Sequence, residues 1–383
     1  MSSRGIAGKV DCAGTKPAPN RRNPMFLAIR DIRFAKGRFA LMGSVVALIT
    51  LLLVMLSGLT AGLGNQSTSA IAALHVQQIV FGAPAGGEPK ASYTESEVSS
   101  QQLEAWREQP GVTSVQALGI SQTRFQSLGD GGTPSGTANV AVFGGSVAPS
   151  AVEDGTVVIG ESLAKDLSLQ AGSRVRVGGK DLTVSAVVED QWYSHTGVVW
   201  TTLETWRSVA HATPGTATIL AVTHDAGTSL DIDAANAAAG TVSADPVGSF
   251  QALASYKSEN GSLMLMQAFL YGISALVIVA FLTVWTVQRT RDIAVLKALG
   301  ASSGYVLRDA LAQAALVLLA GAAVGGSLGL AGGLLAAQAA PFLITPLTTL
   351  VPIAGIVILG LGGAVLAVRK VTKVDPLLAL GGN

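Results

Sequence analysis

The sequence predicts a membrane protein with four transmembrane α-helices, one before and three after a large extracellular α+β domain. Of its 383 residues 49% are hydrophobic and only 13% are charged, about half the charged fraction of a soluble protein. The charges are absent from four long stretches and ordinary elsewhere, a pattern typical of membrane spans joined by aqueous segments. The long segment after the first stretch contains frequent strand signals, which predict the inserted domain.

The four uncharged stretches are long enough to cross a membrane. At 1.5 Å per residue the first extends about 36 Å, and a hydrocarbon core is about 30 Å thick. It is too long for the core of a signal peptide and lacks a convincing cleavage site, so we expect a retained anchor. The stretches are Phe39–Gly62, Gly261–Val287, Ala310–Ala337 and Phe342–Val368.

Flanking cations predict the orientation, because cytoplasmic segments are enriched in Lys and Arg. Both termini are therefore expected in the cytoplasm of a multi-pass plasma-membrane protein, with residues 63–260 and the turn at 338–341 outside. The cations are Arg21, Arg22, Arg30, Arg33, Lys36 and Arg38 before the first span, Arg289, Arg291, Lys297 and Arg308 after the second, and Arg369, Lys370 and Lys373 after the fourth.

The cytoplasmic termini have different characters. Residues 1–24 are rich in Gly, Pro, Ala and Ser, which predicts disorder. Residues 25–38 place apolar side chains near one helical face, which predicts an amphipathic helix on the inner membrane surface; a simple basic flank explains the same residues. The expected cytoplasmic tail is 369–383.

The segment 63–260 predicts an α+β domain, with two small lobes formed from its ends and its middle. Gly178-Gly179 fits the turn of a hairpin. Helices are expected at Glu95–Glu108, Glu161–Leu167 and Leu203–His211. Strands are expected at Gly111–Leu118, Asn139–Phe143, Thr156–Ile159, Arg174–Val177, Leu182–Val188, Gly197–Thr201 and Thr218–Val222.

The sequence does not favour an enzyme, and we expect no metal, cofactor or nucleic acid of its own. A net charge of +1 gives no reason to expect a nucleic-acid partner. The lone Cys12 cannot form an internal disulfide. Gly178-Gly179-Lys180 lacks the Ser/Thr of a phosphate loop, and no GxSxG elbow occurs. The four histidines lack metal-ligand spacing: His75, His195, His211 and His224.

Glycines recur every four residues in the third span. This spacing lines one helix face with glycine and lets a neighbouring backbone approach closely, so we expect helix packing within the bundle. A role in contacting substrate is the alternative. The glycines are Gly321, Gly325, Gly329 and Gly333.

The uncharged spans offer no carboxylate or amine to carry a coupling ion, and the sequence has no nucleotide-binding loop, so energy must come from a partner. The cytoplasmic segment 288–309 is predicted to receive it through an apolar face, with charges that set the register. The alternative is a membrane-associated loop with ordinary positive-inside charge. The apolar face is Ile293, Leu296, Leu299 and Gly300, and the charges are Arg289, Arg291, Asp292 and Lys297.

The sequence RTRDIAVLKALGAS at 289–302 resembles the coupling helix of the MacB/FtsX-type ABC transporter permeases, with Asp292 where that family usually has Glu. The likeness extends over roughly residues 25–376, including GESLAKDL, GSRVRVGG and VSAVVED in the domain and Val374-Asp375-Pro376 near the end. The resemblance implies a homodimer with two copies of a cytoplasmic ATPase, which supplies ATP and Mg²⁺. It also implies that ATP-driven closure moves the external domain.

The size of the domain and the four spans are similar to MacB and to the HrtB-type haem-exporter permeases of Gram-positive bacteria. That likeness implies haem as a substrate, entering sideways from the outer leaflet between the first and second spans of the dimer. Met, Tyr and His can ligate haem iron, although such residues near an interface commonly serve packing. The candidates are Met55, Ser57, His75, Tyr256, Met264, Met266 and Tyr271.

Two other functions fit the same resemblance. The chain could be a mechanotransmitter that moves no substrate and controls an envelope hydrolase, as in FtsX. It could also export antimicrobial peptides or lipoproteins.

Overall fold

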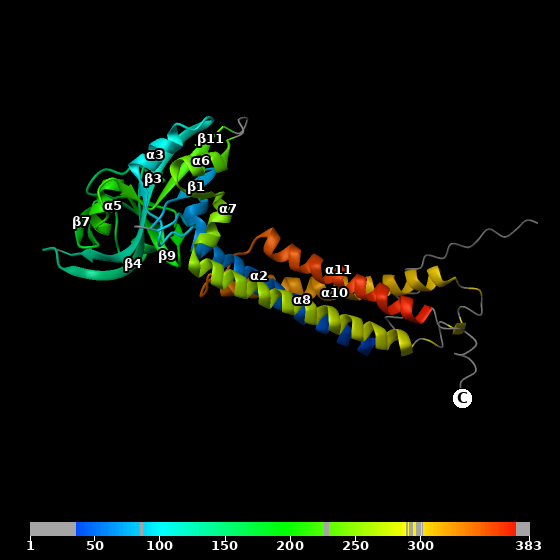
Figure 1. The fold of residues 1–383 in the computed structure, drawn as a ribbon. Coiled ribbons are helices and arrows are strands. Elements are labelled where there is room, and N and C mark those ends of the chain that lie inside the picture. Colours follow the sequence, from blue (N-terminus) through cyan, green and yellow to red (C-terminus); the bar gives the residue numbers. More distant parts are fainter. Residues whose placement is uncertain are drawn as a thin grey trace, which may run out of the picture. The chain divides into compact units, whose positions relative to one another are not determined.

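The computed structural model describes residues 36–84, 87–129, 131–225, 230–288, 290, 294–295, 300 and 302–372. Four of its helices are long and apolar enough to cross a membrane, and an α+β domain lies between the first and second of them along the chain (Figure 1). The helices are α2 (Lys36–Ala72), α8 (Ala254–Gln288), α10 (Ser303–Ala336) and α11 (Pro346–Thr372). The described residues form two compact units, one within 48–273 and 324–355 and the other within 36–47, 274–323 and 356–372.

The helices do not share the bounds of the uncharged stretches. Helix α2 continues to Ala72, α8 begins as early as Ala254, and α11 begins only at Pro346. Helix α10 begins at Ser303, so it includes Arg308 and Asp309, which precede the uncharged stretch Ala310–Ala337. Hydropathy marks where lipid ends, whereas backbone hydrogen bonding continues the helix into water or protein.

The expected cytoplasmic ends fall largely outside the described residues. This applies to the disordered tail at 1–24, to residues 25–35 of the expected amphipathic helix and to 373–383 of the expected tail. Residues 36–38 belong to α2 itself.

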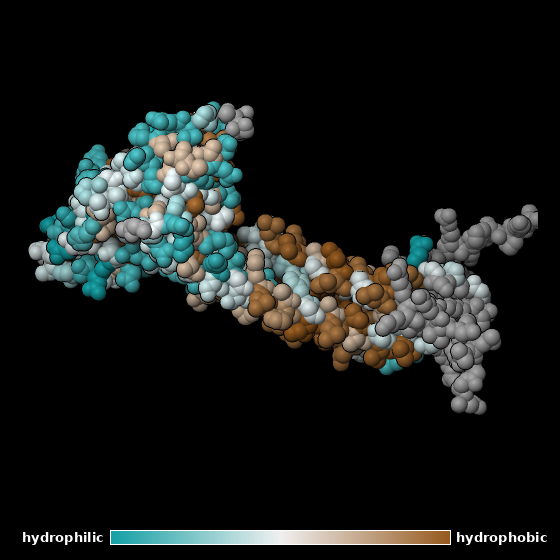
Figure 2. Space-filling model, in the orientation of Figure 1, coloured by the Kyte–Doolittle hydropathy of each residue, from teal (hydrophilic) through white to brown (hydrophobic). Residues whose placement is uncertain are grey.

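Apolar side chains cover much of the visible surface of the long helices (Figure 2). Leu276 of α8, Leu335 of α10, and Leu347 and Ile358 of α11 are each at least 69% exposed. A protein in water rarely exposes so large an apolar surface, whereas lipid chains cover it without cost. Polar residues cover much of the α+β domain in the same view.

Helix α10 lies against α2 through its glycine face. A Cβ atom at Gly321 would lie 2.8 Å from the carbonyl oxygen of Gly43, and one at Gly329 would lie 2.9 Å from Cγ1 of Val54. Gly325 is also buried, and a Cβ at Gly333 would lie 2.6 Å from the Phe342 ring. Gly321, Gly329 and Gly333 have no room for a side chain, which is the packing that small residues allow between membrane helices.

The α+β domain is built on a mixed ten-stranded sheet in the order β12-β1-β11-β3-β4-β9-β5-β7-β6, in which β8 pairs with β9 and β6 also pairs with β3. The strands are β1 (Gln78–Phe81), β3 (Val112–Leu128), β4 (Pro134–Gly144), β5 (Thr156–Gly160), β6 (Arg174–Val177), β7 (Lys180–Val188), β8 (Trp192–Tyr193), β9 (Thr196–Thr201), β11 (Ile219–His224) and β12 (Val242–Ala244).

Short elements cover this sheet and join it to the long helices. A separate two-stranded sheet pairs β2 (Val98–Ser99) with β10 (Thr216–Ala217). The helices are α3 (Ser100–Arg107), α4 (Glu161–Asp166), α5 (Leu203–Ala210), α6 (Ile232–Ala239), α7 (Pro246–Ser249) and the 3₁₀ turn η1 (Phe250–Ala252).

Several domain elements differ from the sequence expectation. Strand β3 extends to Leu128 and β4 starts at Pro134, so both strands are longer than expected. The sequence underestimates their length because long hairpin strands with polar residues on one face lack a continuous apolar signal. Helix α3 begins at Ser100, where the Ser99 side chain and Gln102 form a capping box. Strands from the two ends of the segment, β1, β11 and β12, adjoin one another, and those from its middle form the other end of the sheet.

The end of α2 is part of the domain core. Ala70, Ile71 and Leu74 pack in one buried cluster with residues that include Phe81 and Trp200. In this cluster burial raises the pKa of Tyr93 above its ordinary value, and its hydroxyl donates to Oγ of Ser249 at 2.9 Å. Leu253, directly before α8, is buried in the same core, and Tyr256 in the first turn of α8 packs against it. Both helices are therefore continuous with the folded domain.

The α10–α2 packing predicts unequal effects of two alanine substitutions. Gly321→Ala places a methyl group against the Gly43 backbone, which cannot move aside like a side chain, and should destabilise the protein by about 1–3 kcal/mol. Gly272→Ala on α8, with no atom within 4 Å of its Cβ, should leave stability unchanged or raise it slightly. Thermal unfolding in detergent measures both variants, and equal melting temperatures would contradict the packing.

Candidate functional site

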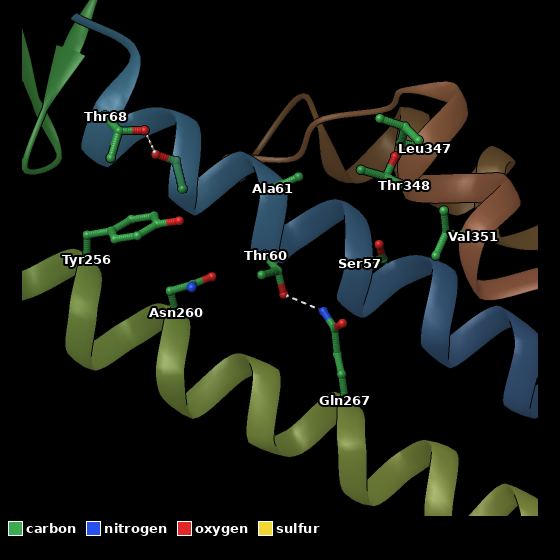
Figure 3. Close-up of a pocket in the computed structure, with 11 residues that line it drawn as sticks. Ser57, Thr60, Ala61, Thr68, Tyr256, Asn260, Gln267, Leu347, Thr348 and Val351 are labelled. Atoms are coloured by element: carbon green, nitrogen blue, oxygen red, sulfur yellow. Dashed lines mark hydrogen bonds between the residues drawn. The ribbon is translucent and has the colours of Figure 1, made fainter. Parts of the chain in front are cut away.

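An open groove lies among α2, α8 and α11, with a volume of about 430 Å³ (Figure 3). It follows the domain-proximal parts of these helices. The residues that line it are Ser57, Thr60, Ala61, Gly64, Thr68, Tyr256, Asn260, Gln267, Leu347, Thr348 and Val351.

The lining of the groove combines neutral hydrogen-bonding groups with small or apolar side chains. Tyr256 and Asn260 extend from α8 towards α2 in Figure 3. Gln267 of α8 donates from Nε2 to Oγ1 of Thr60 on α2 at 2.9 Å. No acidic or basic residue is among the lining residues. Hydroxyl and amide groups at membrane depth are costly unless they bind each other or a ligand.

Two of the seven expected substrate contacts, Ser57 and Tyr256, line the groove. The other groups are dispersed. Met55 lies on the side of α2 that faces α10, with its sulfur 3.4 Å from where a Cβ of Gly332 would be. The Tyr271 ring packs at 2.9 Å from the corresponding position of Gly355 on α11.

The remaining three expected contacts are on the surface. Met264 and Met266 of α8 are 60% and 50% exposed. His75 is exposed in the turn after α2, with φ of +50°. Successive helical residues point about 100° apart, so residues that share a depth in the sequence need not share a face.

Most of the polar lining is not among the expected substrate contacts. Thr60, Gln267 and Thr348 lie inside uncharged stretches, and threonine and glutamine are not among the residue types expected to ligate iron. A usable signal was present, because an amide such as Gln267 in a transmembrane span predicts a hydrogen-bond partner on a neighbouring helix.

The expected ATPase-coupling residues can be placed only in part. Arg289, Arg291, Asp292, Ile293, Leu296, Lys297 and Leu299 lie outside the described residues. Gly300 is described, and its φ of +91° is in the left-handed region that glycine tolerates best. A glycine of this kind is typical just after the end of a helix.

Two family models together match most of the chain, one over the first span and the α+β domain and the other over the last three long helices. The model described as "MacB-like periplasmic core domain" matches residues 39–242, and "FtsX-like permease C-terminal" matches residues 264–376. The chain belongs to the MacB/FtsX-type permeases. It is thus an ABC transporter permease and a multi-pass protein of the plasma membrane, whose family works with an ATPase subunit.

Curated relatives match nearly the full chain. The "putative hemin transport system permease protein HrtB" of Staphylococcus epidermidis is 26% identical over 373 residues, covering 94% of this chain and all of the relative. The protein of the same name from Staphylococcus haemolyticus is 26% identical over 366 residues, covering 94% and 99%. An uncharacterised ABC transporter permease of Mycobacterium tuberculosis is 25% identical over 373 residues, with the same coverage.

Solved structures similar to part of the chain include the periplasmic region of MacB from Actinobacillus actinomycetemcomitans. That match has a TM-score of 0.34 and 11% identity, and covers 45% of this chain and 90% of the other. The extracellular domain of the transporter YknZ from Gram-positive bacteria matches with a TM-score of 0.32 and 11% identity, covering 45% and 99%.

The Thr60–Gln267 hydrogen bond predicts an energetic coupling between α2 and α8. In a double-mutant cycle, Thr60→Val and Gln267→Leu should show a non-additive free energy of unfolding of about 0.6 kcal/mol, the average for hydrogen bonds between membrane helices, and no more than about 1.7 kcal/mol. The same cycle with Thr60→Val and Gln338→Leu, an exposed residue after α10, should be additive. If both cycles are additive, the Thr60–Gln267 hydrogen bond does not couple α2 to α8.

Proposed function

We propose that this permease exports an amphipathic compound that partitions into the membrane, with haem as the first candidate. The groove among α2, α8 and α11 is the observation that carries the proposal. It opens to the surroundings of the helices and lies near the domain, and the flanking cations favour an extracellular domain. A ligand dissolved in the outer leaflet could therefore enter sideways without crossing water.

The chemistry of the lining suits a flat apolar ligand that carries carboxylates. Ala61, Leu347 and Val351 offer contact to an apolar face. The Tyr256 hydroxyl and the Asn260 amide can donate hydrogen bonds to carboxylate oxygens. Haem has both features, and a tyrosine oxygen is one of the groups that can ligate its iron. The names of the staphylococcal relatives support the same cargo.

The proposed transporter is a homodimer that binds two copies of its ATPase, which supplies ATP and Mg²⁺. Segment 288–309 would bind the ATPase, and it contains Gly300 with its left-handed φ. Closure of the dimer on ATP binding would then expel the ligand from the groove.

Haemin titration tests the cargo directly. In nanodiscs the wild-type permease should bind haemin with a shifted Soret band. Tyr256→Phe removes one hydrogen bond to a charged carboxylate, and a loss of about 1.4 kcal/mol should weaken haemin binding about tenfold. Tyr305→Phe on α10, outside the groove, is the matched control and should bind as the wild type does.

Absence of a Soret shift in the wild type, together with unchanged haem tolerance of a deletion strain, would reject haem as the cargo. Sensitivity of that strain to antimicrobial peptides would then favour a peptide or lipoprotein exporter. Co-purification with an extracellular hydrolase, without any resistance phenotype, would favour the mechanotransmitter.

The coupling role predicts a contrast between two glycines. Gly300→Asp should reduce co-purification of the ATPase at least tenfold, because it strains a left-handed position and adds charge to the expected docking face. Gly272→Ala, on α8 outside segment 288–309 and with no atom within 4 Å of its added Cβ, should leave the yield of complex unchanged. Normal assembly of the Gly300→Asp variant would contradict the docking role.

A further inference from the structure

The turn between β8 and β9 rests on the ends of α2 and α8. Ser194 and His195 form its two-residue connection, since Tyr193 pairs with Thr196. Both turn residues have positive φ, +48° and +62°. This is the conformation of a two-residue hairpin turn that matches strand twist.

Backbone hydrogen bonds hold the turn to α2. The amides of Ser194 and His195 donate to the carbonyl oxygens of Ser67 and Gln66, at 3.1 and 3.0 Å. The amide of Trp192 donates to Oγ of Ser69 at 2.8 Å. Any sequence able to form this turn could make the two turn-amide bonds, so they do not depend on the side chains of Ser194 and His195.

The side chains of the turn reach both helices. His195 Nε2 lies 2.8 Å from a carboxylate oxygen of Glu259 on α8 and 3.1 Å from the hydroxyl of buried Ser67 on α2. The Ser194 hydroxyl lies 3.1 Å from that of Ser255 on α8. His195 thus contacts both helices where they enter the domain. We call the two turn residues and their three side-chain partners the clasp: Ser194, His195, Ser67, Ser255 and Glu259.

The residue types in the turn do not suit its backbone best. Asn-Gly is strongly preferred where both residues need positive φ, while non-glycine residues there cost energy. Histidine enters the left-handed region more readily than most residues. A Ser-His pair in this position gives up turn stability and gains the side-chain contacts to Ser255, Glu259 and Ser67.

We propose that His195 is a positioning residue that fixes the domain to α2 and α8 together, so that movement of these helices during the ATP cycle is passed to the β8–β9 hairpin and the sheet behind it. The inference goes beyond the proposed cargo and rests only on the chain being the permease of an ATP-driven system. Strand β9 pairs with both β4 and β5, so the clasp leads directly into the centre of the sheet.

The test replaces the clasp side chains and keeps the turn. The double variant Ser194→Asn, His195→Gly retains the backbone hydrogen bonds and suits positive φ. Its domain should therefore melt no lower than the wild type. Ser168→Gly relieves another left-handed serine, between α4 and β6, and is the matched control.

Hydrogen exchange of the complex with its ATPase, nucleotide-free and then trapped with ATP and vanadate, supplies the functional measurement. We expect nucleotide trapping to change exchange of β4 and β9 amides in the wild type and in Ser168→Gly. In Ser194→Asn, His195→Gly that change should fall by at least half. Glu259→Gln, which weakens only the charged contact, should give an intermediate loss.

A reversible cross-link distinguishes positioning from folding. With Cys12→Ser, which removes the native cysteine, Ser194→Cys and Ser255→Cys place two thiols where hydroxyls lie 3.1 Å apart. Combined with His195→Gly, this pair should restore the nucleotide response when oxidised and lose it when reduced. A wild-type response without the clasp side chains, or no restoration by the disulfide, would overturn the proposal.

Discussion

The structure depends on the continuity of α2 between the membrane bundle and the domain. This helix is apolar along the part that packs against the glycines of α10, yet its last turns carry Ala70 and Ile71 into the buried core of the α+β domain. Unfolding the end of α2 would expose that core to water. Packing therefore contacts this helix both along α10 and at its end in the domain core.

The same continuity explains why the polar groove has its position. Where α2 and α8 approach the domain, their residues change from apolar to polar while both helices continue. Hydroxyl and amide groups therefore face one another at membrane depth. Gln267 donates to the Thr60 hydroxyl, which in turn donates to the Leu56 carbonyl oxygen. Tyr256 and Asn260 also face α2 and can serve a ligand. A neutral lining lets an apolar ligand enter from lipid without first desolvating a buried charge.

The sequence was sufficient for the architecture because lipid imposes a simple rule, an uncharged stretch of adequate length. It was weaker on helix ends, since α2 continues through polar residues up to Ala72, and on long hairpin strands such as β3. Identifying the residues of the candidate site required the direction in which each side chain points from its helix. Ser57 and Tyr256 share the groove while Met55 lies towards α10, a difference of helix face that spacing alone does not resolve without the positions of the neighbouring helices.

The most direct test of the account is ATP-dependent extraction of haemin from the membrane. Proteoliposomes that contain the permease with its ATPase would be loaded with haemin, and transfer to an external apo-protein acceptor would be followed by absorbance. We expect haemin transfer to require ATP and to be lost when Tyr256→Phe and Gln267→Leu are combined. Transfer at the same rate without ATP, or full ATP-dependent transfer by the double variant, would contradict the groove as the export site.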